Sequence, residues 1–146
     1  MIYDRHELKQ LRKAARYFGL SAPSLFWRAK LSTLAELCNG FGSESFPKPV
    51  RKLFDWLYRK YKVIAAIHDV DYELSDGTER KRALADERFR TNAYLMWRQK
   101  YGKLRFVNPI ALWERRKLRI AYKMLRLFGS VAWNAAYTKN KGTSDV

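Results

Sequence analysis

Apolar residues recur along this chain mostly every three or four positions, the spacing that places side chains on one face of an α-helix. The first such stretch covers residues 4–18, where Asp4 can cap the helix and Gly19 can end it. Four apolar residues share one side of this helix: Leu8, Leu11, Ala15 and Phe18. A break follows, and a second helix is expected from a cap at Ser24 to about Leu37.

The stretch between residues 25 and 60 mixes helical and irregular signals. Residues 25–28 are mainly apolar and aromatic, and their burial is favoured over a role as an exposed anchor. Glycine and proline interrupt the pattern over residues 38–49, because a residue that precedes proline disfavours helix. Residues 52–60 mix aromatic and basic side chains, which fits either a short helix or a loop that faces a membrane.

An antiparallel pair of helices is the central prediction. The first helix runs from about Lys62 to Leu74 and the second from Glu79 to about Tyr101. The turn between them contains an Asp-Gly pair, which suits a chain reversal, and Thr78, which can cap the second helix. One face of the second helix is apolar except for one charge: Ala83, Asp86, Phe89, Ala93 and Trp97. A connection this short makes the two helices antiparallel neighbours.

A basic helix is predicted near the C-terminal end, from a cap at Asn108 to about Phe128. Its apolar residues form one stripe: Trp113, Ile120, Met124, Leu127 and Phe128. Its bases are Arg115, Arg116, Lys117, Arg119, Lys123 and Arg126. Residues 132–137 add a turn, and residues 138–146 form a frayed tail. The predicted fold is therefore all-α, with the antiparallel helix pair as its core, extra N-terminal helices and this basic C-terminal helix.

Composition narrows the class of protein and the kind of partner. A chain of 146 residues that is 47% hydrophobic fits one domain with a real core. The net charge of +16 predicts a negatively charged partner: nucleic acid, an anionic membrane surface or an acidic protein. The single cysteine, Cys38, excludes an internal disulfide framework. We expect no transmembrane helix, since no run of about 18 apolar residues is free of charge, and no signal peptide.

The candidate chemistry centres on residues 67–72. On a helix, His68 and Tyr72 are four residues apart and share a face, while Asp69 points about a quarter turn away. Counted from the turn, Asp86 lies at a similar height to Tyr72, so a contact among His68, Tyr72 and Asp86 is geometrically plausible. A base, an orienting carboxylate, a carboxylate for a hard metal and a glycine-containing loop are the parts of metal-assisted hydrolysis.

These residues resemble the phospholipase A2 superfamily, and they are closest to its disulfide-free viral forms, the parvovirus capsid phospholipase and the phospholipase-like proteins of tailed bacteriophages. The motifs are Cys38-Asn39-Gly40-Phe41-Gly42, His68-Asp69-x-x-Tyr72 and Ala85-Asp86-x-x-Phe89. The resemblance covers about residues 37–137. It leaves residues 1–36 as an N-terminal helical extension and 138–146 as the tail. A separate phage family of unknown function has a similar pair of helical motifs without needing the glycine loop.

The resemblance implies a role for each motif residue. His68 would take a proton from the water that attacks the sn-2 ester, Asp86 would orient His68, and Tyr72 would hold Asp86. Asp69 would bind calcium together with the carbonyl oxygens of three loop residues: Cys38, Gly40 and Gly42. The implied protein is a calcium-dependent phospholipase that acts at an anionic membrane surface. It would belong to a virion or to the host-cell cytoplasm, in peripheral contact with the membrane.

Bases and tryptophans supply the predicted lipid-facing surface, over residues 48–60 with Trp56 and residues 109–126 with Trp113. The main alternative is a non-enzymatic basic virion protein with the same scaffold, which binds nucleic acid, membrane or other virion proteins. An HD-type phosphohydrolase needs several histidines, and His6 is the only other one. An EF-hand counted from Asp69 would need glycine where Leu74 stands.

Overall fold

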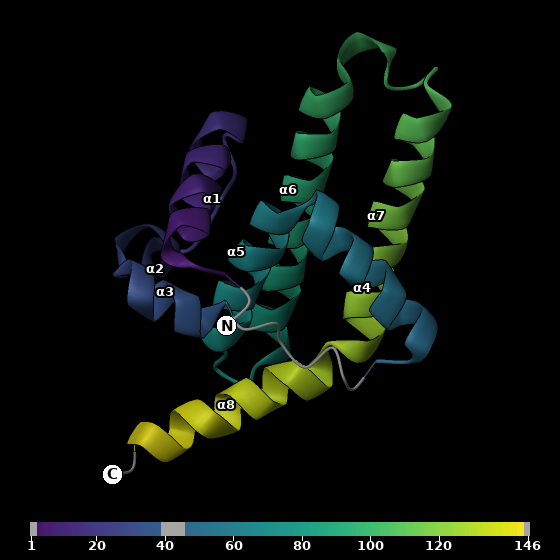
Figure 1. Ribbon diagram of the computed structural model, residues 1–146. Coiled ribbons are helices and arrows are strands. Elements are labelled where there is room, and N and C mark those ends of the chain that lie inside the picture. Colours follow the sequence, from purple (N-terminus) through teal and green to yellow (C-terminus); the bar gives the residue numbers. More distant parts are fainter. Residues whose placement is uncertain (1–2, 39–45, 145–146) are drawn as a thin grey trace.

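The computed structural model describes residues 3–38 and 46–144, and its regular elements there are all helical (Figure 1). The elements are α1 Arg5–Phe18, α2 Ser24–Arg28, α3 Leu31–Leu37, α4 Lys48–Lys60, α5 Lys62–Glu73, α6 Glu79–Tyr101, the short 3₁₀ helix η2 Gly102–Leu104, α7 Pro109–Phe128 and α8 Ser130–Ser144. The all-α class is therefore confirmed, and residues 52–60 belong to a helix rather than to a loop.

Three of the predicted helix caps are confirmed by side-chain hydrogen bonds. The Asp4 carboxylate accepts from the backbone N–H of Glu7 at 2.7 Å, and the Thr78 hydroxyl accepts from that of Lys81 at 3.3 Å. Asn108 caps α7 through the N–H of Ile110 at 2.9 Å. Each cap satisfies a backbone donor that the first turn of a helix leaves without an internal partner.

The predicted second helix differs from the structure, because it is divided into α2 and α3 by extended backbone at Ala29 and Lys30. Arg12 of α1 accounts for part of this division. Its guanidinium donates to the carbonyl oxygens of Phe26 at 2.8 Å and Ala29 at 2.5 Å, which satisfies carbonyls that a continuous helix would use. Phe26 itself is fully buried, as expected, whereas Ser24 is the first helical residue and not the cap.

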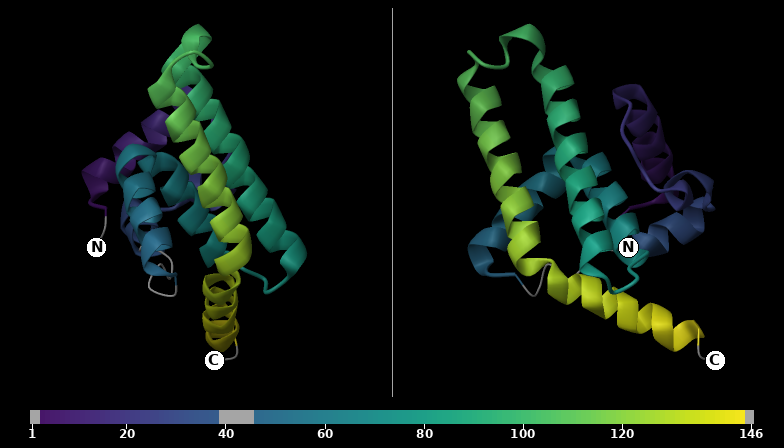
Figure 2. Two further views of the ribbon diagram at one scale, coloured as in Figure 1. Left: turned by 90° about the vertical axis from the view of Figure 1, so that its right-hand side faces the viewer. Right: turned by 180° about the vertical axis from the view of Figure 1, so that it is seen from behind.

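α5 and α6 form the predicted antiparallel pair, and α6 lies between α5 and α7 (Figures 1 and 2). α5 is enclosed by its neighbours, so that ten consecutive residues from Val63 to Tyr72 are buried. α1 and α3 pack against α5, and α4 crosses α5 and α7. One hydrophobic cluster extends from Tyr3 to Leu125, so the N-terminal helices share the core of the central pair.

α7 buries its other apolar side, and only part of the predicted stripe packs on the core. Trp113 is 55% exposed and Leu127 is 66% exposed, whereas Met124 and Phe128 are partly buried against the core. The residues that α7 buries are Ala111, Glu114, Leu118, Ala121 and Leu125. The helix is apolar on two sides, and the side with alanines allows a closer approach to α6.

The C-terminal segment also differs from the prediction. α8 continues to Ser144, so the part of the predicted tail that the structure describes is helical. Trp133 is buried and packs edge-on against Tyr72, with their ring centres 5.2 Å apart. Farther along, Lys139 pairs with the Glu73 carboxylate at 3.1 Å, and the Asn140 side chain donates to the Glu73 carbonyl at 2.7 Å. These contacts hold α8 against the end of α5.

Candidate active site

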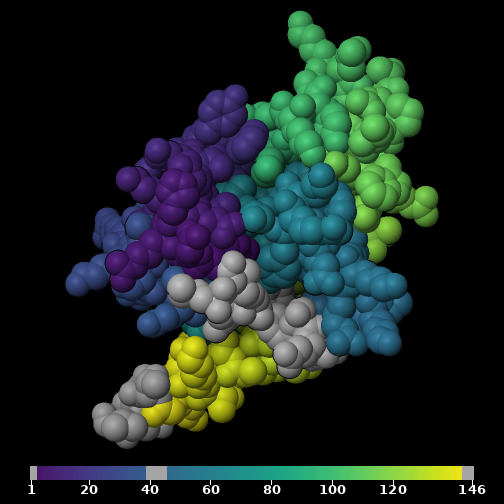
Figure 3. All heavy atoms as spheres, in the orientation of Figure 1, coloured from purple at the N-terminus to yellow at the C-terminus, as the bar shows by residue number. Residues whose placement is uncertain are grey.

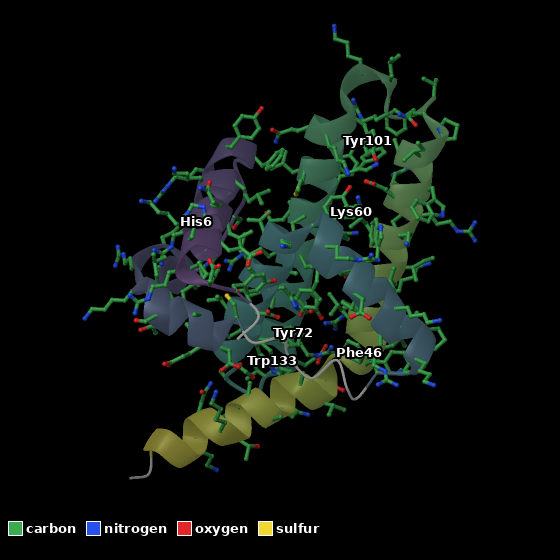
Figure 4. The ribbon with its side chains drawn as sticks, viewed as in Figure 1. His6, Phe46, Lys60, Tyr72, Tyr101 and Trp133 are labelled. Carbon is green, nitrogen blue, oxygen red and sulfur yellow. The ribbon has the colours of Figure 1, made fainter. Side chains whose placement is uncertain are left out.

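His68, Tyr72 and Asp86 lie together in the central helix pair, and their predicted contact is confirmed. Nε2 of His68 lies 3.1 Å from Oδ1 of Asp86, and the Tyr72 hydroxyl donates to the same oxygen at 2.8 Å. α5 presents the imidazole and the phenol one turn apart, and α6 presents the carboxylate. Figure 4 labels Tyr72 and Trp133 beside each other, where the pair meets α8. A histidine is therefore oriented by a buried carboxylate.

The second oxygen of Asp86 contacts two arginines that the sequence analysis did not assign to the site. Nη1 of Arg126 donates to Oδ2 at 2.7 Å, and Nη1 of Arg82 lies 3.5 Å from the same atom. Arg82 is four residues before Asp86 on α6, so helical spacing could have identified it. Arg126 comes from α7, 40 residues away, and was assigned to the lipid-facing bases. Its pairing with Asp86 corrects that assignment.

This network keeps Asp86 ionised although the carboxylate is completely buried. Burial opposes ionisation, but hydrogen bonds from His68, Tyr72 and Arg126 outweigh it and lower the pKa of the Asp86 carboxyl group. A carboxylate only accepts hydrogen bonds, so the proton shared with His68 belongs on Nε2. In that tautomer Nδ1 carries the lone pair, and Nδ1 is the nitrogen that can accept a proton.

The His68 side chain is enclosed by its neighbours. It is 1% exposed. Its ring centre lies 4.2 Å from that of Tyr72 and 5.4 Å from that of Phe89. Truncation at this position would leave a cavity, so a side chain of similar size is the better test of function.

Asp69 and Cys38 are close enough to interact electrostatically. The carboxylate of Asp69 is buried, and its Oδ1 accepts a hydrogen bond from the Tyr58 hydroxyl at 3.2 Å. Burial, followed by the negative charge of Asp69, raises the pKa of both Tyr58 and the Cys38 thiol. A buried carboxylate at this position suits a hard cation.

The other expected calcium ligands, Gly40 and Gly42, lie outside the described residues. Within residues 3–38 and 46–144, no group of three or more His, Cys, Asp or Glu side chains is placed to hold a metal. A calcium ion at Asp69 would therefore depend on backbone carbonyl oxygens for most of its ligands, as the glycine loop motif implies.

Asp71 is the third carboxylate of the motif region, and it has a structural partner. Nη1 of Arg88 donates to its Oδ1 at 2.7 Å across the helix pair. Burial raises the pKa of Asp71, and the positive charge of Arg88 opposes that rise. Asp71 therefore fastens α5 to α6.

The predicted lipid-facing surface is only partly exposed. Trp56 is 6% exposed, so it belongs to the core, and the prediction that it faces lipid is wrong. The connection between α6 and α7, together with the start of α7, instead exposes a group of large apolar residues: Leu104, Phe106, Val107, Ile110 and Trp113. Lys103 and Arg105 lie in the same connection. Figure 3 shows this part of the chain, in green, projecting from the molecule.

Comparison of the chain with family models, with curated proteins and with solved structures gives no match. In the described part of the chain, none of the helices is both long enough and apolar enough to cross a membrane. Function must therefore be argued from the geometry of the site.

Proposed function

We propose that this protein is a calcium-dependent hydrolase of glycerophospholipid sn-2 esters, of the phospholipase A2 type, with His68 as the general base. The observation that carries the proposal is the 3.1 Å contact between Nε2 of His68 and Asp86, whose oxygen also accepts the Tyr72 hydroxyl. Asp69 follows His68 directly, so a base and a possible metal ligand are adjacent on one helix. The resemblance to bacteriophage phospholipases supports the same reaction.

In this mechanism His68 accepts a proton at Nδ1 from the water that attacks the ester carbonyl. Asp86 stabilises the imidazolium that forms, and Tyr72 keeps the carboxylate in place. His68 then returns the proton to the departing glycerol oxygen, which leaves a lysophospholipid and a fatty acid. Bound calcium, held by Asp69 and the carbonyl oxygens of Cys38, Gly40 and Gly42, would supply positive charge for the substrate phosphate and the developing oxyanion.

Arg126 and Arg82 act on this reaction through Asp86. Together they offset the negative charge of a carboxylate that has no exposure to water. They also fix its Oδ2, which leaves Oδ1 directed at His68. We assign both arginines a positioning role.

The exposed apolar connection between α6 and α7 supports contact with a bilayer. Apolar side chains flanked by lysine and arginine favour the interface of an anionic membrane, and the net charge of +16 adds long-range attraction. We therefore propose that the substrate is taken from an anionic phospholipid surface. High salt should release the protein from such vesicles, because it screens the attraction.

The test is fatty-acid release from phosphatidylglycerol vesicles with calcium, and again with a chelator. His68→Gln keeps most of the side-chain volume and should lower release by roughly 10²- to 10⁴-fold. His6→Gln is the matched control: His6 is the only other histidine, it lies exposed on α1 (Figure 4), and its replacement should change nothing. The proposal fails if the wild-type protein releases no fatty acid above background, or if release is unaffected by the chelator.

The second candidate is a non-enzymatic basic virion protein that binds nucleic acid or membrane. One observation favours it: His68 is 1% exposed, and Asp86 has three hydrogen-bond partners and a further ion pair with Arg82, which also suits a purely structural network. Binding to vesicles without hydrolysis of their lipid, together with salt-sensitive binding to DNA, would support this candidate.

A further inference from the structure

A groove runs along the seam between α6 and α7, beyond the Asp86 network. Its volume is about 530 Å³, within the range of roughly 300–1,000 Å³ that is usual for small-molecule sites. Its floor is apolar and comes from both helices: Ala93, Tyr94, Trp97, Leu118 and Tyr122. Trp97 is fully buried, and its indole N–H donates to the Ala111 carbonyl at 2.7 Å, so the floor is held in place. α6 and α7 lie side by side in both views of Figure 2.

The rim of this groove carries four positive charges. They are Arg90, Arg115, Arg119 and Lys123. Arg90 pairs with Glu87 at 2.6 Å, whereas Arg119 and Lys123 have no carboxylate within ion-pair distance among the described residues. These two are exposed and lie four residues apart on α7, so they project from one face of it. An apolar floor beneath uncompensated cations is complementary to an amphipathic anion.

Two of the three aromatic rings that line the groove are already covered by guanidinium groups. Arg90 lies over Tyr122 at 5.3 Å, and Arg115 lies over Trp97 at 5.7 Å. The third ring, Tyr94, is 42% exposed. Recognition of a nucleotide base relies on stacking against such ring faces. Since arginines occupy two of the three, the apolar surface of the groove is better suited to an aliphatic chain than to a planar base.

We propose that this groove binds a single-chain aliphatic anion of the fatty-acid class, with its carboxylate between Arg119 and Lys123 and its chain along the floor at Ala93 and Leu118. The groove does not include His68, Asp86 or Asp69. The inference therefore goes beyond the proposed hydrolysis and does not depend on it. A protein without esterase activity would still bind this ligand.

The experiment measures binding of decanoate to the full chain by titration calorimetry, below the micelle concentration and without calcium. We expect saturable binding at one site, which weakens as salt is added. Decyltrimethylammonium carries the opposite charge and should bind much more weakly, and butyrate should not bind because its chain is too short to cover the floor. Equal affinity for the cationic amphiphile would overturn the proposal.

Charge reversal tests the rim. The double variant Arg119→Glu/Lys123→Glu should weaken decanoate binding by roughly tenfold or more, since the ligand then meets two negative charges. The control is Lys9→Glu/Lys13→Glu, which makes the same charge change at the same spacing on exposed positions of α1 and should have little effect. If both double variants weaken binding equally, only the net charge matters and the groove is not the site.

Two further variants separate this site from the others. Thr91 is an exposed lining residue, and Thr91→Trp should obstruct the groove and weaken decanoate more than it weakens inorganic phosphate. His68→Gln should bind decanoate as the wild type does, so failure of the esterase proposal leaves this one intact. Stronger binding of a dinucleotide than of decanoate, lost in the Arg119→Glu/Lys123→Glu variant, would contradict the aliphatic ligand and indicate nucleic acid.

Discussion

Two buried carboxylates lie on the helices of the α6–α7 seam, and they differ in one kind of partner, a histidine. Asp86 contacts a tyrosine, a histidine and arginines, whereas Glu114 contacts the Tyr61 hydroxyl at 2.6 Å and the Lys100 ammonium at 3.1 Å. In both, burial opposes ionisation and hydrogen bonds outweigh it, so the pKa of each carboxyl group is lowered. Figure 4 labels Tyr101, the last residue of α6, and Tyr72 of α5, whose hydroxyl donates to Asp86.

The comparison separates what holds the fold from what can do chemistry. Hydrogen bonds from two tyrosines and a lysine lower the pKa of the buried Glu114 carboxyl group. The Asp86 cluster contains the same kinds of partner and, in addition, an imidazole, the side chain that most often serves as a general base. His68 is therefore the feature that distinguishes the two clusters.

The largest expected effect concerns turnover. Asp86→Asn should lower fatty-acid release by roughly 10²- to 10⁴-fold, because an amide can hold the ring but cannot stabilise the imidazolium. Glu114→Gln should leave turnover per folded molecule unchanged. The measurement is release from phosphatidylglycerol vesicles, normalised to the folded fraction from circular dichroism. Equal losses in the two variants would mean that neither carboxylate acts in the reaction.

The next expected effect is on stability, and it differs between the cation that pairs with Asp86 and the cation that pairs with Glu114. The Arg82 side chain is 7% exposed and also donates to the Leu125 carbonyl at 3.1 Å, so Arg82→Met should lower the free energy of unfolding by about 3 kcal/mol. Lys100 is 36% exposed, and Lys100→Met should cost only about 1 kcal/mol. Urea unfolding gives both values. A larger loss of unfolding free energy for Lys100→Met would show that the Glu114 ion pair stabilises the fold more than the Asp86 ion pair does.

A third prediction concerns two glycines, Gly129 beside the Asp86 cluster and Gly102 beside the Glu114 cluster. A Cβ at Gly129 would come within 2.5 Å of the Leu125 carbonyl oxygen and the Tyr72 hydroxyl, so Gly129→Ala should cost about 2 kcal/mol. Gly102 has open space but a φ of 62°, so Gly102→Ala should cost about 1 kcal/mol through backbone strain alone. Thermal unfolding measures both costs. Fatty-acid release should fall in Gly129→Ala only, because its Cβ displaces the Tyr72 hydroxyl. An unchanged environment of Tyr72 in that variant would contradict this explanation.

The smallest effect is the acid dependence of stability. Because the folded-state pKa of each group is lowered, its contribution is present above the unfolded-state pKa and is lost as the pH falls through the folded value. The loss should begin below about 4.5 for Glu114 and below 3.8 for Asp86. Urea midpoints should be measured between pH 6 and pH 2.5. Glu114→Gln should remove the part of the acid-induced decline that begins at the higher pH, and Asp86→Asn should remove the part that begins at the lower pH. The reverse order would argue against these ionic states.

The two clusters also show how far sequence reasoning reaches. The contact of His68 with Asp86 spans one helical hairpin, so the length of the turn and the helical period were enough to predict it. The contacts of Arg126 with Asp86 and of Tyr61 with Glu114 join residues 40 and 53 positions apart. They depend on how α7 is rotated against α6, which local spacing does not determine.

α7 illustrates the physical reason for that limit. Its sequence has two apolar sides, one with Trp113, Ile120 and Leu127 and one with Ala111, Leu118 and Leu125. The prediction named only the first side, whereas the fold buries the second, where small residues permit a close approach. The bounds and the cap of α7 were predictable because they depend on neighbouring residues. The groove and the arginine partners were not, because they depend on that rotation.

The spacing of the contacts around Asp86 also implies an order of events as the chain folds. Its imidazole partner is 18 residues away and its Arg126 partner 40, and each doubling of a loop adds about 0.6 kcal/mol of closure entropy. Asp86 should therefore meet His68 first, within a nascent α5–α6 hairpin, and receive the guanidinium only when α7 docks. In refolding kinetics, Phe89→Ala should then slow folding, while Leu125→Ala should mainly accelerate unfolding.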